Sequence, residues 1–267
     1  MLNKWEIAGG SVIGKDHLRT FKNNQDAFYW KSSEHALIAV VSDGCGSSPY
    51  SEVGAQLGAR FIANQLLELT GGIESFDPVS VMAVLFDRCK NFLKSVASQV
   101  DSTYKSVNEL LLFSIVGCVV RKDLTVIFSI GDGYYDHAQT LLPVILEPQA
   151  GNSPSYLSYA LFGQDKVGGS GLVPTGFNLE VISGENPDYL LLGSDGILNL
   201  IKAEEQVVPG KNEKIGSLSQ FWQEDKYFKN SDEIRRRLTV INRDYKSLDQ
   251  FGPLHDDTTL IVLRKRR

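Results

Sequence analysis

Apolar and polar positions along this chain follow two different periods, and the change of period divides the sequence into blocks. Residues 26–31 and 36–42 are apolar and β-prone with a polar turn between them, which predicts two neighbouring strands. From residue 50 to residue 69, apolar positions recur every three or four residues, as on one face of a helix. A second helical stripe follows Pro78, and Asp77 before it suits a helix start.

Beyond residue 110 the pattern returns to strands. A helix is expected over residues 231–245 with Ser231 as its cap, and a last strand over residues 258–263. Residues 148–176 are rich in Gly, Ser and Pro and predict a long surface loop, of the kind that often carries function. Strands and helices come in blocks, which indicates an α+β fold of antiparallel sheets with helices packed outside them. The other expected strands are residues 111–120, 124–130, 144–146, 177–182 and 189–193.

Composition narrows the class of protein. No low-complexity linker divides the 267 residues, so a single domain over residues 1–267 is expected, and 42% hydrophobic residues can fill a sizeable core. The net charge of -5 argues against a nucleic-acid binder. The longest apolar run, residues 110–120, is shorter than the roughly 20 residues that span a bilayer, so no membrane association is expected. The N-terminus lacks a signal-like apolar stretch, and the three cysteines form no CxxC, so a reducing cytoplasm is expected.

Acidic residues stand at the ends of several apolar runs. Three such runs end in Asp-Gly, at Asp43, Asp132 and Asp195. Asp256 opens the final strand in HDDTTLIVL, and Asp26 begins an early strand in NNQDAFYW. One Asp-Gly after a strand is usually only a turn. Repetition favours a shared site, although spacing alone leaves open whether the strand ends converge.

Carboxylates gathered at one place repel each other, so protons or a cation must sit between them. Hard divalent cations such as Mg²⁺ and Mn²⁺ prefer oxygen ligands. Two such ions roughly 4 Å apart can clamp a phosphoryl oxygen and activate water as a hydroxide at neutral pH. A converging cluster would therefore suit hydrolysis of phosphate esters without a covalent enzyme intermediate.

Five segments, in order, resemble the metal-dependent protein phosphatases of the 2C type, especially their compact bacterial members. The resemblance runs from about residue 24 to residue 262, nearly the whole chain. It implies a sandwich of two antiparallel β-sheets flanked by helix pairs, and phosphoserine or phosphothreonine in proteins as the substrate. Bacterial members of this family often reverse the action of a partner serine/threonine kinase, so the resemblance also implies such a kinase partner. The matching segments are NNQDAF, VVSDGCGSSPYSEVGA, SIGDG, LLLGSDGIL and HDDTTLIV.

The resemblance also implies roles for individual residues. Asp43 matches the aspartate that bridges both metal ions, and the carbonyl of Gly44 matches a backbone ligand. Asp195 and Asp256 match the carboxylates of the first ion, and catalysis is expected to depend on these two and Asp43. Asp26 matches an early acidic position that binds the ions or orients their waters.

A further match is Asp132, which corresponds to the aspartate that helps to hold a third, weaker ion in many members. The cofactors implied are thus two Mn²⁺ or Mg²⁺ ions, with a third as an option.

Two departures from the family concern the early motif. Gln25 stands where many members have Glu, and Phe21 stands where many have a phosphate-binding Arg. If the segment is extended, Arg19 points to the same face as residue 21, which makes Arg19 the leading candidate for the phosphate contact. Lys22 and His17 are the alternatives.

Cys45, after the Asp43-Gly44 pair, is either a reactive thiol or a small residue packed beside the site. The four histidines are too scattered to predict zinc, and neither GxSxG nor a nucleotide-binding glycine loop occurs. The alternative to an enzyme is a phosphatase-fold module that binds phosphoproteins or a kinase with weak or no catalysis.

Overall fold

The computed structural model describes residues 4–72, 76–147, 154–167 and 171–266, whose named strands fall into two antiparallel sheets. The first sheet has the order β1 (Trp5–Val12), β10 (Thr258–Lys265), β9 (Tyr189–Gly193), β6 (Gly133–His137) and β7 (Val144–Leu146). The second has the order β2 (Ala27–Ser32), β3 (Leu37–Gly44), β4 (Phe113–Val120), β5 (Leu124–Ile130) and β8 (Asn178–Ser183).

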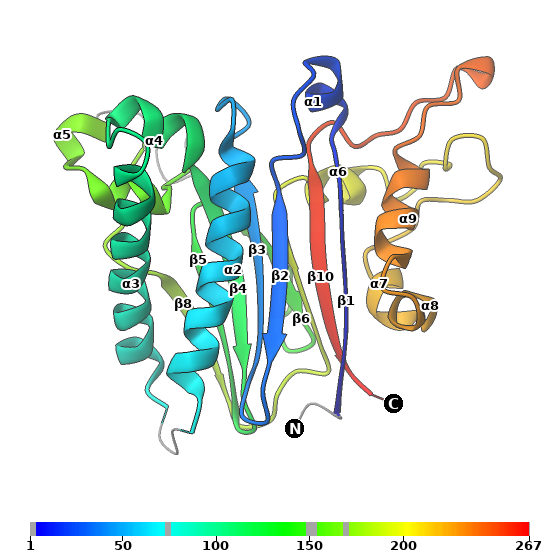
Figure 1. Ribbon diagram of the computed structural model, residues 1–267. Helices are drawn as coiled ribbons and strands as arrows, with labels where there is room; N and C mark the ends of the chain where they lie inside the picture. Colours follow the sequence, from blue (N-terminus) through cyan, green and yellow to red (C-terminus); the bar gives the residue numbers. More distant parts are fainter. Residues whose placement is uncertain (1–3, 73–75, 148–153, 168–170, 267) are drawn as a thin grey trace.

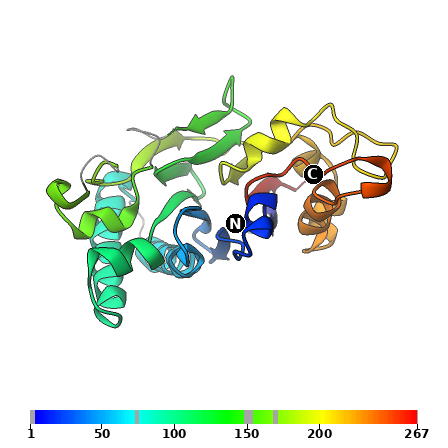
Figure 2. The ribbon, with the colours of Figure 1, turned by 90° about the horizontal axis from the view of Figure 1, so that it is seen from above.

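Helices cover the outer face of each sheet (Figures 1 and 2). The second sheet carries α2 (Ser51–Thr70) and α3 (Pro78–Ser98), with α4 (Tyr104–Leu110) at one end. The first sheet carries α6 (Ile197–Lys202), α7 (Gln220–Gln223), α8 (Lys226–Lys229) and α9 (Glu233–Ile241). The short α1 (Lys15–Arg19) lies beyond the ends of β1 and β2. The result is the expected four-layer sandwich.

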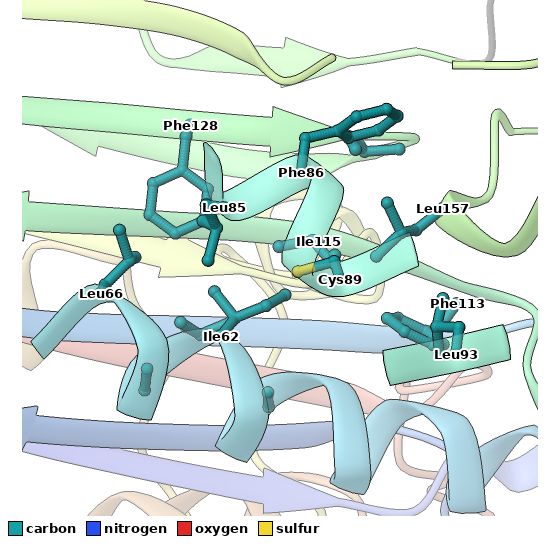
Figure 3. Close-up of a cluster of buried hydrophobic side chains, with 14 of the residues drawn as sticks. Ile62, Leu66, Leu85, Phe86, Cys89, Leu93, Phe113, Ile115, Phe128 and Leu157 are labelled. Atoms are coloured by element: carbon teal, nitrogen blue, oxygen red, sulfur yellow. The ribbon is translucent and has the colours of Figure 1, made fainter. Parts of the chain in front are cut away.

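Three apolar cores hold these layers together. One lies between the second sheet and helices α2 and α3 (Figure 3), one lies between the two sheets, and one lies between the first sheet and α6–α9. Every residue of β4 is buried, because both of its faces are covered. This is why the central strands appear in the sequence as continuous apolar runs and not as an alternation of apolar and polar residues.

Most of the elements expected from the sequence are confirmed. The bounds of β5, β7 and β9 coincide with the predicted ones, and Asp77 caps α3 by accepting a hydrogen bond from Ser80 N at 3.1 Å. Strands β1 and β6 and the short helices were not anticipated. The predicted helix over residues 231–245 is too long, because α9 covers only Glu233–Ile241 and is preceded by Asp232 in place of Ser231.

The expected surface loop over residues 148–176 is only partly described, since residues 148–153 and 168–170 lie outside the described residues. Its described part contains a 3₁₀ helix (Leu157–Leu161) and α5 (Gln164–Val167). Leu157 and Tyr159 are buried there, at 1% and 3% exposure. The prediction of a plain surface loop is wrong for this part, because its apolar side chains pack against the body of the protein. Of the helices that the structure describes, none has the length and apolar character to cross a membrane.

Candidate active site

The acidic residues noted in the sequence stand at one end of the sandwich, on segments from both sheets. Asp26 precedes β2 and Asp43 is near the end of β3; the two strands pair so that Ala27 lies opposite Ser42. Asp132 lies in the turn where the chain passes from β5 in one sheet to β6 in the other.

Two more acidic residues reach this end from the first sheet. Asp195 follows β9 and Asp256 precedes β10, and these strands are antiparallel neighbours. The hydrogen bond from Ser194 N to Thr259 O, 3.0 Å long, joins the two strands at this end. The strand ends that the sequence left unconnected therefore converge.

Mutual repulsion shows how close the carboxylates are. Burial raises the pKa of Asp43 well above its usual range, and the charges of four other aspartates raise it further. Burial and the charge of Asp195 raise the pKa of Asp132 to about 6, against a hydrogen bond with Ser114 that lowers it. The four aspartates that act on Asp43 are Asp26, Asp195, Asp132 and Asp256.

Asp26 gives the clearest evidence that a cation fits this place. The residue is 6% exposed, and neither carboxylate oxygen has a hydrogen-bond partner in the described chain. Burial and then the Asp257 charge raise its pKa well above the usual range. The nearby hydroxyls of Ser194 and Thr259 lower this pKa, but they donate their hydrogen bonds to the Asp257 carbonyl and to Ser11 Oγ.

A buried carboxylate without a partner is costly, so a proton or a cation must compensate it. The donor set consists of oxygens alone, which suits Mg²⁺ or Mn²⁺ better than zinc. Across the described ranges, no three His, Cys, Asp or Glu side chains are already grouped tightly enough to hold a metal ion.

Close backbone packing explains why a glycine follows Asp43. A Cβ on Gly44 would lie 2.6 Å from the carbonyl oxygen of Gln25, which is too close for any other residue. The Gly44 amide donates to that same carbonyl at 3.2 Å. Gln25 itself is 1% exposed; its Nε2 donates to Ser48 O, while its Oε1 has no partner in the described chain. Gly44 thus brings β3 against the segment that carries Asp26.

Asp257 has a structural position that the sequence did not reveal. It is 2% exposed and accepts hydrogen bonds from Gly14 N at 2.6 Å and from Gln25 N at 2.6 Å. Its other contact is His17 Nδ1, 2.8 Å from Oδ2. In the sequence, the only hint of this role was that Asp257 stands directly after Asp256. Burial and then the charge of Asp195 raise the pKa of Asp256, although part of that residue remains open to solvent.

The segment around Arg19 does not meet the condition of an extended backbone, because Lys15–Arg19 forms helix α1. The argument that Arg19 shares a strand face with Phe21 therefore no longer applies. The side chain of Arg19 is 68% exposed and pairs with Asp16 at 3.0 Å. Phe21 is 97% exposed with φ of 57°, so it lies outside the cluster.

Cys45 packs beside the site. It is half-buried against Leu112 and Tyr156, and its Sγ lies 3.1 Å from Ser47 Oγ. Burial acts to raise the pKa of this thiol, but hydrogen bonds with Ser47 and Tyr156 outweigh it and leave the pKa below its usual value.

This fold and this cluster define a class of protein: an αββα sandwich with a cluster of aspartates at one end. A protein-family model described as "Protein phosphatase 2C" matches residues 13–224. The chain belongs to the protein phosphatase 2C family, and so to the metal-dependent protein serine/threonine phosphatases. No curated protein sequence was found to match it.

Solved structures agree on the fold. A serine/threonine phosphatase of S. agalactiae is 14% identical with a TM-score of 0.59, over 98% of this chain and 100% of that one. The phosphatase Stp1 from Staphylococcus aureus is 15% identical with a TM-score of 0.58, over 98% and 95%. RsbX in complex with magnesium is 15% identical with a TM-score of 0.50, over 98% and 96%.

Proposed function

We propose that this protein hydrolyses phosphoserine and phosphothreonine in proteins with two Mn²⁺ or Mg²⁺ ions, and that the cluster is its active site. The observation that carries the proposal is the buried, unpartnered carboxylate of Asp26 beside a set of mutually repelling aspartates. A third, weaker ion beside Asp132 is part of the same proposal. The proposed ligands are the carboxylates of Asp26, Asp43, Asp132, Asp195 and Asp256 and the carbonyl of Gly44.

Each proposed ligand would hold the ions from a different side of the site. Asp43, on β3, and Asp195, after β9, hold the site from the two sheets and so fix the distance between its halves. Asp26 closes the buried side and Asp256 the side open to solvent. Bound ions of this kind supply Lewis-acid activation of water and of the phosphoryl group. No side chain then needs to act as a nucleophile.

The sequence-based assignment of Arg19 to the substrate phosphate stays a prediction. Its exposed pair with Asp16 is of a kind worth about 0–1 kcal/mol, so the side chain is free to turn toward a ligand. We further infer a cytoplasmic protein of one catalytic domain that opposes a serine/threonine kinase. The shared core between the sheets supports the single domain, and the free thiols of Cys45, Cys89 and Cys118 support the location.

The test is turnover of a phosphothreonine peptide by chelator-treated protein before and after Mn²⁺ or Mg²⁺ is restored. Activity is expected only with metal, and Asp43→Asn is expected to lower kcat/KM by roughly a hundredfold or more, because it would remove the charge of a proposed metal ligand. Asp87→Asn is the matched control, since Asp87 lies on the exposed side of α3, paired with Lys90. Turnover that survives chelation contradicts the proposal, and tight phosphopeptide binding without turnover assigns the chain to the binding-module alternative.

A further inference from the structure

His17 is a buried imidazole beside the cluster that the proposed metal site does not use. It lies on α1 and is 9% exposed. Its Nδ1 is 2.8 Å from Oδ2 of Asp257, 240 residues away in the sequence. A carboxylate at this distance accepts the Nδ1 proton, so the contact fixes the orientation of the ring.

Asp257 is itself held in place by the backbone. The amides of Gly14 and Gln25 both donate to it at 2.6 Å, and the residue is 2% exposed. Two short hydrogen bonds from backbone amides and the contact with the imidazole already use the Asp257 carboxylate. Of Asp256 and Asp257, Asp256 is therefore the candidate metal ligand. Asp257 therefore holds the His17 ring in place, and Asp257 is itself bonded to the backbone of Gln25, next to Asp26.

The other ring nitrogen of His17 lies beside the loop that follows Asp43 and Gly44. A Cβ added to Gly46 would lie 3.4 Å from Nε2, so this nitrogen borders the loop that begins two residues after Gly44. Gly46 is exposed and has no side chain to cover the ring. Nε2 has no hydrogen-bond partner in the part of the chain that the structure describes. The ring also lies near enough to Asp256 for their charges to interact: burial and then Asp195 raise the pKa of Asp256, and His17 opposes that rise.

Two neighbouring cations make other contacts in the structure, and neither is both buried and held in place as His17 is. Lys22 donates from Nζ to the carbonyl oxygens of Gly46 and Ser48, which ties down the same loop. The guanidinium of Arg19 points to Asp16 at the surface. Of these three basic residues, His17 is the one that is buried, fixed and still has a free nitrogen at the rim of the cluster.

We propose that His17, oriented by Asp257, donates a hydrogen bond from Nε2 to a non-bridging oxygen of the substrate phosphate and so positions the phosphoryl group. The proposal rests on the proposed function. In this arrangement Nδ1 keeps its contact with Asp257 while Nε2 donates to the phosphate. Such a charge-assisted bond adds to the hold of the metal ions and restricts rotation of the phosphoryl group.

Two isosteric variants separate this role from a merely structural one. His17→Asn retains an amide NH₂ where Nδ1 stands and loses Nε2, so it preserves the Asp257 contact alone. His17→Gln places an amide NH₂ near the position of Nε2. The probe is inorganic phosphate, titrated calorimetrically into the Mn²⁺-loaded protein, together with KM and kcat for a phosphothreonine peptide.

We expect His17→Asn to weaken phosphate binding and raise KM by about tenfold or more, as for a lost hydrogen bond to a charged group, with Mn²⁺ affinity unchanged. His17→Gln should recover much of that loss. A purely structural histidine predicts the reverse, with His17→Asn like the wild type. His35→Asn is the matched control and should be silent, because His35 lies in the β2–β3 turn at the other end of the strands.

Wild-type phosphate binding by His17→Asn overturns the proposal. So does weakened binding in Arg19→Ala together with normal binding in His17→Asn, which gives the contact to Arg19. If His17→Asn does not fold, Gly46→Val decides, because its side chain covers Nε2 without touching Asp257; unchanged phosphate binding there also overturns the proposal. If the wild type binds phosphate but hydrolyses no phosphopeptide, the proposed function fails while the His17 comparison still stands.

Discussion

At the scale of one residue, Asp132 shows how the aspartate cluster destabilises the metal-free protein. Its pKa is raised to about 6 by burial and by the charge of Asp195. A carboxyl with a higher pKa in the folded chain binds more protons when folded, so its contribution to folding falls as the pH rises past its unfolded value. The loss begins near pH 4 and is complete above the folded pKa of about 6. Asp26 and Asp43 act in the same direction.

We therefore predict that Asp132→Asn stabilises the metal-free protein at pH 7.5 by roughly 1–3 kcal/mol, since one pKa unit corresponds to about 1.4 kcal/mol. Near pH 4 the gain should be small, because the wild-type carboxyl is then largely protonated in the folded chain. Urea unfolding of both proteins in chelator at the two pH values measures the difference. Asp87→Asn should show no such pH-dependent gain, and an equal gain at both pH values would contradict the role of repulsion.

Helix α2 shows, at the scale of an element, that local preference yields to packing. Its apolar stripe predicted the helix, but Gly54 and Gly58 lower the helix propensity of its first half. Both glycines are needed where the helix meets its neighbours. A Cβ on Gly54 would lie 2.6 Å from the Leu110 carbonyl oxygen, and one on Gly58 would lie 2.5 Å from the Phe113 ring.

Gly54→Ala is accordingly expected to destabilise the protein by about 1–3 kcal/mol, the usual cost of overpacking. On an open helix surface the same change would stabilise by roughly 1 kcal/mol. Gln56→Ala, two residues along on an exposed position, is the control and should change the free energy of unfolding by less than about 0.5 kcal/mol. Chemical denaturation measures both; a stabilised Gly54→Ala protein would show that α2 does not pack this closely.

Packing also explains the elements that the sequence analysis missed or misplaced. Strand β1 contains Gly9 and Gly10, which weaken a strand pattern, yet a Cβ on Gly10 would lie 2.5 Å from Arg235 N in α9. Gly10 is small because helix α9 lies on the strand, and Gly9 is small because the rings of Phe28 and Trp30 lie against it. Helix α9 ends at Ile241. The side chain of the next residue, Asn242, donates a hydrogen bond to Ile13 O and accepts one from Leu254 N. These partners are far away in the chain and leave no local signal.

At the scale of the whole molecule, the cluster joins the two sheets at one end of the sandwich. Asp43 comes from the second sheet, Asp195 and Asp256 come from the first, and Asp132 lies at a crossing between them. An ion bound there should tie the sheets together and relieve the repulsion at once. Binding at a hundredfold excess over Kd adds about 2.7 kcal/mol.

Saturating Mn²⁺ should therefore raise the Tm of the chelator-treated protein by roughly 5–10 °C, at about 2–4 °C per kcal/mol for a chain of this size. Differential scanning fluorimetry with and without metal measures the shift. Asp43→Asn should lose most of the shift and Asp87→Asn should retain it. An equal shift in both variants would place the metal elsewhere on the protein.

The sequence by itself determined most of the longer strands and helices and indicated the type of chemistry. Long apolar runs bounded by glycine and aspartate specified β5 and β9, because burial on both faces of a central strand leaves a local mark. The repeated Asp-Gly pairs indicated an oxygen-ligand metal site, because few other arrangements tolerate so many acids. Only the tertiary structure decided which residues meet. The contact between His17 and Asp257 spans 240 residues, and Arg19 lies on a helix, so it does not share a strand face with residue 21. Hydrogen bonds and repulsion act through space over a few ångströms, so convergence depends on how the sheets pack and not on spacing along the chain.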